Sequence, residues 1–239
     1  MNLDLSGRKA VVTGASKGIG AATVRLLADH GAQVAFCARG QEAVDELSNH
    51  QPTAATGSVH GYVADMADAT STQAFLEAVD ADHGPPDILV NNVGASPSRN
   101  FLYMSDQDWE DLHQLNLMSA VRCTRHCLPH MREQRWGRVV MIATGAAFYP
   151  SAALIDYAAT KAAMIATAKA LATKYGADNV LVNSVSPGLS RTDMWERAAG
   201  ELAAANDTDP EAIFERNSRG VPVGRYGTSE EIANGVVFL

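Results

Sequence analysis

The sequence predicts an α/β fold in which one parallel sheet is doubly wound, with helices on both of its faces. Six short runs rich in β-branched and apolar residues alternate with longer stretches of helical pattern, and the strands are apolar almost throughout. Strands buried on both faces have this character in parallel sheets. We predict strands at residues 9–14, 33–38, 59–65, 87–92, 138–144 and 180–186, with helices near 18–30, 41–49, 68–82, 107–134 and 152–175.

The chain reads as one domain spanning residues 1–239, because no repeat, low-complexity tract or linker divides it. Residues from about 189 to 227 carry no strand pattern, a length unusual for a plain connection. They contain two short helical patterns, so we expect a lid or substrate-binding insertion. Thr228 and Glu231 then form a predicted capping box that opens a last helix. No closing strand follows, so we expect the final strand of the sheet to be missing from the sequence.

Composition excludes several classes of protein. The hydrophobic fraction of 46% and the formal charge of −8 describe an ordinary globular chain and argue against a general nucleic-acid binder. Neither a membrane-spanning run nor a signal-peptide pattern is recognised, and three cysteines suit a reducing compartment, so we expect a cytoplasmic protein. Cys123, His126, Cys127 and His130 are offset around a predicted helix, which favours buried core cysteines over a metal site.

A glycine-rich turn, TGASKGIG, follows the first predicted strand and opens the first helix. Gly14 would allow the tight turn, Gly18 would let the backbone approach a pyrophosphate, and Gly20 would let helix and strand pack closely. The helix N-terminus would offer free N–H groups to phosphates. The context predicts a Rossmann-type dinucleotide site, with the other turn residues Ser16, Lys17 and Ile19 at the cofactor.

The end of the second strand favours NADP(H) over NAD(H). An acidic residue there usually binds the adenosine ribose hydroxyls, whereas this chain has Ala38 followed by Arg39. Arg39 can bind a 2′-phosphate through two parallel hydrogen bonds, and Lys17 can add a second positive charge. The alternative is that both are ordinary solvated surface charges.

Two further strand ends carry candidate cofactor contacts. Asp65, followed by Met66, is placed to accept a hydrogen bond from an adenine amino group, or equally to cap the next helix. Asn91 and Asn92 would tie neighbouring strand ends together, and Gly94 would let the backbone approach the cofactor.

Tyr157 and Lys161 lie one turn apart in an alanine-rich helical run, and Thr144 ends the preceding strand. A nearby ammonium stabilises a phenolate and lowers the tyrosine pKa, and a hydroxyl can polarise a substrate carbonyl. The alternative is that a Tyr and a Lys at this spacing are frequent by chance, and that a tyrosine on a helix is usually a core or rim residue.

The motifs TGASKGIG, NNVG, Asn116 within QLNLMSAV, YAATK and NSVSPG occur in an order and at spacings that resemble the short-chain dehydrogenase/reductase family, from about residue 6 to the last residue. The resemblance implies that Tyr157 is the general acid/base, and that Lys161 binds the nicotinamide ribose and lowers the Tyr157 pKa. It implies that Asn116 holds a water in a proton relay. It also places Pro187, Gly188 and Thr192 around the nicotinamide carboxamide. The chain departs from the family in having Thr144 for Ser, Val93 for Ala, and no seventh strand.

These observations together predict an NADP(H)-dependent oxidoreductase that interconverts a ketone, or a 3-oxoacyl group, and a secondary alcohol. The partner is then a small carbonyl or alcohol substrate, or an acyl thioester, and the resemblance, together with the alanine-rich helix, implies a homodimer or homotetramer. The alternatives are an NAD-dependent alcohol dehydrogenase of the same family, a non-catalytic nucleotide-binding protein, and a methyltransferase. We expect a mostly apolar substrate pocket lined by Ser96, Phe148, Tyr149, Leu154, Leu189, Met194 and Trp195.

Overall fold

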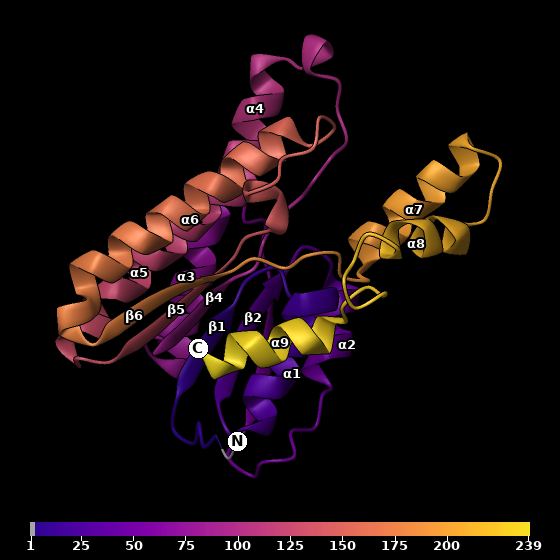
Figure 1. The fold of residues 1–239 in the computed structure, drawn as a ribbon. Coiled ribbons are helices and arrows are strands. Elements are labelled where there is room, and N and C mark those ends of the chain that lie inside the picture. The colour runs from indigo at the N-terminus through magenta and orange to yellow at the C-terminus, as the bar shows by residue number, and fades with distance from the viewer. Residues whose placement is uncertain (1–2) are drawn as a thin grey trace.

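The six predicted strands form one parallel sheet in the computed structural model, which describes residues 3–239 apart from the side chains of Asp193 and Met194. The order is β3-β2-β1-β4-β5-β6 (Figure 1), so the chain reverses its direction of winding between β1 and β4. β6 lies at one edge of the sheet in the described chain. The strands are β1 (Lys9–Val12), β2 (Gln33–Ala38), β3 (Ser58–Val63), β4 (Ile88–Asn91), β5 (Gly137–Ile142) and β6 (Val180–Val185).

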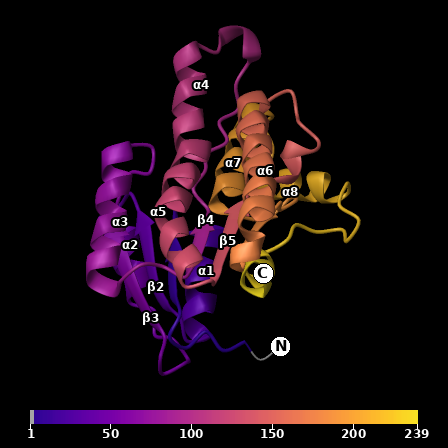
Figure 2. The same cartoon turned by 90° about the vertical axis from the view of Figure 1, so that its left-hand side faces the viewer.

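Helices cover both faces of the sheet, as predicted. On one face α1 (Gly18–Asp29), α2 (Gln41–Ser48) and α9 (Ser229–Phe238) pack around Val12, Phe36 and Val90. On the other face α3 (Ala69–His83), α5 (Ser119–Glu133) and α6 (Ile155–Tyr175) pack around Val11, Leu89 and Met141. Figure 2 shows α3, α5 and α6 in a row in front of the sheet. Alternate residues of each central strand therefore enter opposite cores, which explains their continuous apolar pattern.

The helix predicted near 107–134 is interrupted by a π-helical turn. α4 (Asp106–His113) runs into η2 (Gln114–Met118), which continues directly into α5. A π turn inside a longer helix is rare and is frequently found at functional sites. Here it contains the predicted site residue Asn116.

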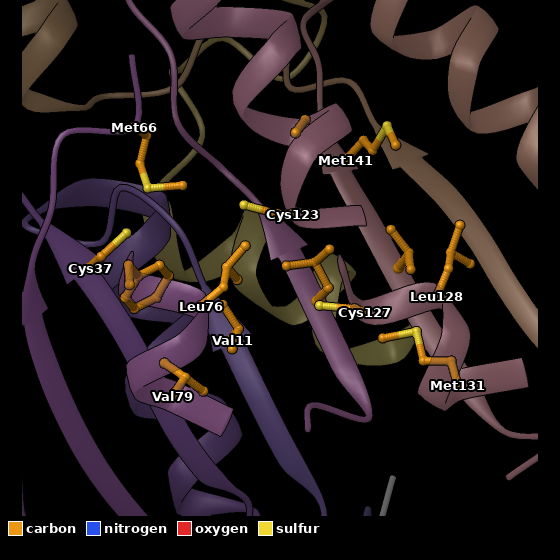
Figure 3. Close-up of a cluster of buried hydrophobic side chains, with 14 of the residues drawn as sticks. Val11, Cys37, Met66, Leu76, Val79, Cys123, Cys127, Leu128, Met131 and Met141 are labelled. Carbon is orange, nitrogen blue, oxygen red and sulfur yellow. The ribbon is translucent and has the colours of Figure 1, made fainter. Parts of the chain in front are cut away.

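The three cysteines are fully buried with free thiols, as the sequence favoured. Figure 3 shows Cys123 and Cys127 among the side chains of one core, with Met131 and Met141 nearby and Cys37 across the cluster. Burial raises the pKa of all three thiols. His126 pairs with Asp80 instead, at 2.9 Å between Nε2 and Oδ2.

The predicted insertion forms α7 (Asp193–Ala205) and α8 (Pro210–Ser218), which stand beside the sheet in Figure 1. They share a small core of Ala199, Ala203, Ile213, Phe214 and Tyr226, separate from the two cores of the sheet. The two ends of the insertion meet where Ser190 pairs with Gly227. The predicted capping box of Thr228 and Glu231 is present at the start of α9. Within the described chain, no helix combines the length and apolarity that crossing a bilayer requires.

Candidate active site

A cleft of about 360 Å³ lies at the carboxyl ends of the strands, where the winding reverses between β1 and β4. Ligands of open α/β sheets bind at this kind of position. The glycine turn, the ends of β2, β4 and β5, α6 and the start of the insertion all contribute to its walls. The predicted residues that line it are Gly14, Ser16, Lys17, Gly18, Ile19, Arg39, Asp65, Met66, Asn92, Gly94, Thr144, Tyr157, Lys161, Pro187, Gly188, Thr192 and Trp195.

The glycine turn has the conformation expected of an anion-binding loop. Gly14 and Gly18 have φ values of +66° and +56°, a region that side chains disfavour. α1 begins at Gly18 with no side-chain cap and no acidic residue in its first turn, so its N–H groups and positive dipole end suit a phosphate. Gly20 is buried outside the cleft wall, where a Cβ would lie 2.5 Å from Asn92 Nδ2. Its role is therefore the close packing that the sequence suggested.

Two exposed cations, Lys17 of the glycine turn and Arg39 after β2, lie on the cleft wall. Among the residues that the structure describes, no hydrogen bond or ion pair holds the Arg39 guanidinium. Asp65 lines the same cleft but does not cap α3, because Asp68 accepts the hydrogen bond from Ser71 N–H at 2.7 Å. The capping alternative for Asp65 is wrong, and its carboxylate instead accepts from Ala67 N–H at 3.0 Å.

The residues at the end of β4 and just after it, from Asn91 to Gly94, connect several walls of the cleft. Asn92 Nδ2 donates to the carbonyls of Thr13 and Gly14, at 3.2 and 2.8 Å, so it ties β4 to β1 as expected. Asn91 instead bonds Thr124 of α5. A Cβ on Gly94 would lie 3.1 Å from Lys161 Nζ. The structure thus shows that the missing side chain of Gly94 makes room for the lysine, a role that the sequence did not reveal.

The side chains of Thr144 and Tyr157 are neighbours in the cleft wall. Burial raises the pKa of Tyr157, and a hydrogen bond from the Thr144 side chain opposes this rise. The same Thr144 oxygen accepts from Ala146 N–H at 3.2 Å, which fixes the hydroxyl at the end of β5. A donor directed at the phenol oxygen favours phenolate and marks the place where a carbonyl oxygen can be bound.

Lys161 is almost fully buried on α6, one turn after Tyr157. Its Nζ donates to the carbonyl of Ile142 at 2.8 Å and to that of Val93 at 3.3 Å. Burial lowers its pKa to about 8, so the side chain is still mainly protonated at pH 7. The expected lowering of the Tyr157 pKa by Lys161 is not seen in this structure, where only Thr144 acts in that direction.

Asn116 is completely buried in η2, and its side chain bonds both the backbone of Ala95 and the side chain of Thr160. Nδ2 donates to the Ala95 carbonyl at 3.0 Å and to Thr160 Oγ1 at 3.1 Å, while Oδ1 accepts from Ala95 N–H at 2.9 Å. Thr160 Oγ1 in turn donates to the Tyr157 carbonyl at 2.8 Å. Asn116 therefore braces the turn of α6 that carries Tyr157. Its role in a water relay stays a prediction.

Most of the predicted substrate-pocket residues lie away from the cleft. Phe148 and Tyr149, just after the short turn η3 (Gly145–Ala147), are 60% and 86% exposed. Leu189 packs against the core of the insertion instead. Ser96 and Leu154 are half-buried outside the cleft wall, and the side chain of Met194 lies outside the described part of the chain. Only Trp195 of this predicted set is placed at the cleft by the described side chains.

The cleft also contains residues that the sequence reasoning missed. Arg197 and Ser190 come from the insertion, Leu115 from η2 and Cys37 from β2. Arg197 follows Thr192 by little more than one turn of α7. The helical pattern that begins after Thr192 could therefore have indicated that Arg197 lies at the cleft. Thr192 itself lies over the glycine turn, because a Cβ on Gly18 would be 3.8 Å from its methyl group.

Comparison with known proteins places the chain in a family. A family model described as short chain dehydrogenase matches residues 8–202. An uncharacterised oxidoreductase of Bacillus subtilis is 37% identical over all of this chain and 91% of that protein. The 3-oxoacyl-(acyl-carrier-protein) reductase of Escherichia coli is 33% identical over 99% of this chain and 91% of that protein.

Solved structures of reductases have the same fold as this chain. The L-sorbose reductase of Gluconobacter frateurii, complexed with NADPH and L-sorbose, superposes with a TM-score of 0.94 at 33% identity, covering all of this chain and 91% of that one. The actinorhodin polyketide ketoreductase with NADPH gives 0.89 at 31% identity, covering 97% and 89%. The family, the Rossmann-type fold and the assignment as an oxidoreductase are thereby confirmed: the chain belongs to the short-chain dehydrogenase/reductase family.

Proposed function

We propose that the protein is an NADP(H)-dependent oxidoreductase that interconverts a ketone, or a 3-oxoacyl group, and a secondary alcohol. The observation that carries this proposal is the meeting of Thr144, Tyr157 and Lys161 in the same cleft as an uncapped, glycine-lined helix N-terminus. A hydroxyl donor, a phenol and a buried ammonium at one phosphate-binding cleft are the groups that a carbonyl reductase needs.

The cofactor site fits a phosphorylated dinucleotide. The start of α1 offers N–H groups to a diphosphate, and Lys17 and Arg39 offer positive charge beside Ala38, where an acid would repel a 2′-phosphate. Asp65 and Met66, which line the same cleft, would border the adenine, and Pro187, Gly188 and Thr192 would border the nicotinamide carboxamide. The reductase neighbours from Gluconobacter frateurii and the actinorhodin pathway contain NADPH, which supports the preference.

When bound, the nicotinamide cofactor supplies or accepts the hydride at the substrate carbon. Thr144 and Tyr157 bind the carbonyl oxygen, and Tyr157 gives it a proton in reduction or takes one in oxidation. Burial keeps the phenol protonated at neutral pH, which suits the acid role. Lys161, whose ammonium is held by the carbonyls of Ile142 and Val93, would bind the ribose of the nicotinamide half.

The substrate class follows from the cleft and from the relatives. Leu115 and Trp195 add apolar side chains to the cleft wall, while Arg197 adds a cation. Relatives act on a 3-oxoacyl carrier protein or on L-sorbose, as their names state. An uncharged ketone or a 3-oxoacyl thioester is the substrate that we infer. Exposed alanines along α6, such as Ala159, Ala162 and Ala166, support pairing of this helix with a second copy in a dimer or tetramer.

The test is NADPH oxidation across ketones, β-ketoacyl thioesters and sugars, repeated with NADH. We expect turnover of at least one ketone class, with NADPH preferred by tenfold or more in kcat/KM. Equal rates with NADH would favour an NAD-dependent alcohol dehydrogenase. Binding of NADPH with no turnover of any carbonyl would favour a non-catalytic nucleotide-binding protein. Titration with S-adenosylmethionine separates the methyltransferase alternative.

A further inference from the structure

We propose that Arg99 and Asp156 form an ion pair that positions Tyr157 for proton transfer. This inference rests on the proposed function, because it assigns a task within the same reaction. Arg99 lies in the loop after β4, and Asp156 immediately precedes Tyr157 in the first turn of α6. Both are positioning residues, and neither lines the cleft.

Asp156 is a charged residue in an unusual place, since it is only 1% exposed. Both of its carboxylate oxygens are used. Oδ1 accepts from the backbone N–H of Tyr157 at 2.8 Å, and Oδ2 accepts from Arg99 at 2.8 Å. One oxygen thus holds the backbone of the acid/base residue, while the other is held by a guanidinium from a different loop. A carboxylate in the first turn also suits the positive end of the helix dipole.

Arg99 connects three segments around the site. Besides Asp156, its guanidinium reaches the carbonyl and the carboxylate of Asp108 in α4, each at 3.3 Å. Its backbone N–H donates to the Ala153 carbonyl at 3.2 Å. The loop that follows β4 carries Gly94, and the loop that leads to α6 begins at Thr144. Arg99 therefore fixes the two loops that flank the reaction centre relative to each other and to Tyr157.

The burial of the Asp156 carboxylate distinguishes this pair from the exposed arginine pairs. Exposed ion pairs contribute little, and Arg132 with Asp178 is an example, at 2.8 Å with the arginine 52% exposed. In contrast, removing Arg99 would leave a buried carboxylate without its partner, which proteins tolerate poorly. The carboxylate would then seek water or another donor and draw the first turn of α6 with it. Displacements approaching 1 Å at a reacting group cost about 100-fold in rate.

Four variants test the pair in the full-length protein: Arg99→Met, Arg99→Lys, Asp156→Asn and the double variant Arg99→Met with Asp156→Asn. We expect Arg99→Met to lower kcat by roughly 10- to 100-fold, with the dissociation constant of NADPH within about twofold of the wild type. Arg99→Lys keeps the positive charge but lacks the planar guanidinium, so its kcat should lie between those of the wild type and Arg99→Met. Asp156→Asn keeps an acceptor for the Tyr157 N–H, so its kcat should fall less than the kcat of Arg99→Met.

The double variant gives the decisive comparison. Because its neutral amide no longer needs a cation, it should recover most of the activity that Arg99→Met loses. Arg132→Met serves as the matched control and should keep wild-type kcat. A wild-type kcat in Arg99→Met, no recovery in the double variant, or an equal loss of NADPH affinity would each overturn the proposal.

A second readout does not depend on turnover. Hydrogen exchange of peptides covering residues 95–105 and 153–160 should be faster in Arg99→Met and return toward wild type in the double variant. If the wild type reduces no carbonyl, the proposed function fails, and this exchange pattern alone still decides whether the pair holds Tyr157. Unchanged exchange in Arg99→Met would refute the positioning role.

Discussion

Gly94→Ala is predicted to impair catalysis without preventing folding. A Cβ at this position would lie 3.1 Å from Lys161 Nζ, 3.3 Å from its Cε and 3.5 Å from Asn116 Oδ1. The contact with Asn116 is ordinary, but restoring a separation of about 3.5 Å requires Lys161 Nζ to move by roughly 0.4 Å. The lysine cannot move freely, because the carbonyls of Ile142 and Val93 hold its ammonium.

The size of the effect follows from that displacement. If about 1 Å costs 100-fold, a shift of this size lowers kcat by roughly 6-fold. This corresponds to about 1 kcal/mol in the activation free energy. Tight packing should cost about 1–2 kcal/mol of stability, partly offset by the lower entropy of the unfolded alanine chain. The melting temperature should therefore fall by only a few degrees.

The assay is steady-state NADPH oxidation with the best ketone of the panel, together with thermal unfolding. Gly176→Ala is the control, because Gly176 ends α6 with a helical φ of −58° and nothing lies within 4 Å of its added Cβ. The control should keep wild-type kcat. A folded Gly94→Ala variant with wild-type kcat would show that the position of Lys161 Nζ does not matter, and the reasoning would fail.

Three further predictions concern the same site. Thr144→Ala should lose most activity, because it removes the donor that opposes the raised pKa of Tyr157, whereas Thr144→Ser should keep it; comparison of kcat in the two variants checks this. Burial lowers the pKa of Lys161 from its ordinary value of 10.5 to about 8, so the side chain is mainly charged below pH 8 and loses its proton as the pH rises. The rate of ketone reduction should therefore fall above about pH 8, and a flat profile from pH 6 to 10 would contradict this. Arg39→Ala should lower kcat/KM for NADPH by roughly 10- to 100-fold and leave NADH nearly unaffected, as expected for the loss of a charge-assisted phosphate contact; an equal effect on both cofactors would show that Arg39 does not bind the 2′-phosphate.

The fold could be predicted from the sequence because local pattern and global architecture agree. Apolar strands such as residues 33–38 leave no polar face, so only a sheet covered on both sides accommodates them. The capping box of Thr228 and Glu231 could also be predicted, because both residues lie in one short segment and bond each other's backbone. The cleft residues of the glycine turn could be predicted for the same reason, since the turn and the start of α1 are continuous in sequence.

Not every contact between distant segments could be predicted. Gly94 and Lys161 are far apart in the chain, so their close approach was not visible in either motif. The low pKa of Lys161 follows from complete burial, which depends on the packing of α6 against the strand ends. Phe148 and Tyr149 were expected in the pocket, but hydrophobicity alone does not determine where a loop directs its side chains.

The most direct test of the central claim is the rate of NADPH-dependent ketone reduction by Tyr157→Phe. Phenylalanine keeps the ring and removes the hydroxyl that faces Thr144. Loss of a general acid that donates to the carbonyl oxygen should lower kcat by about 10²–10⁴-fold, while NADPH still binds as tightly as in the wild type. A Tyr157→Phe enzyme with unchanged kcat and unchanged NADPH affinity would contradict the assignment of Tyr157 as the acid/base.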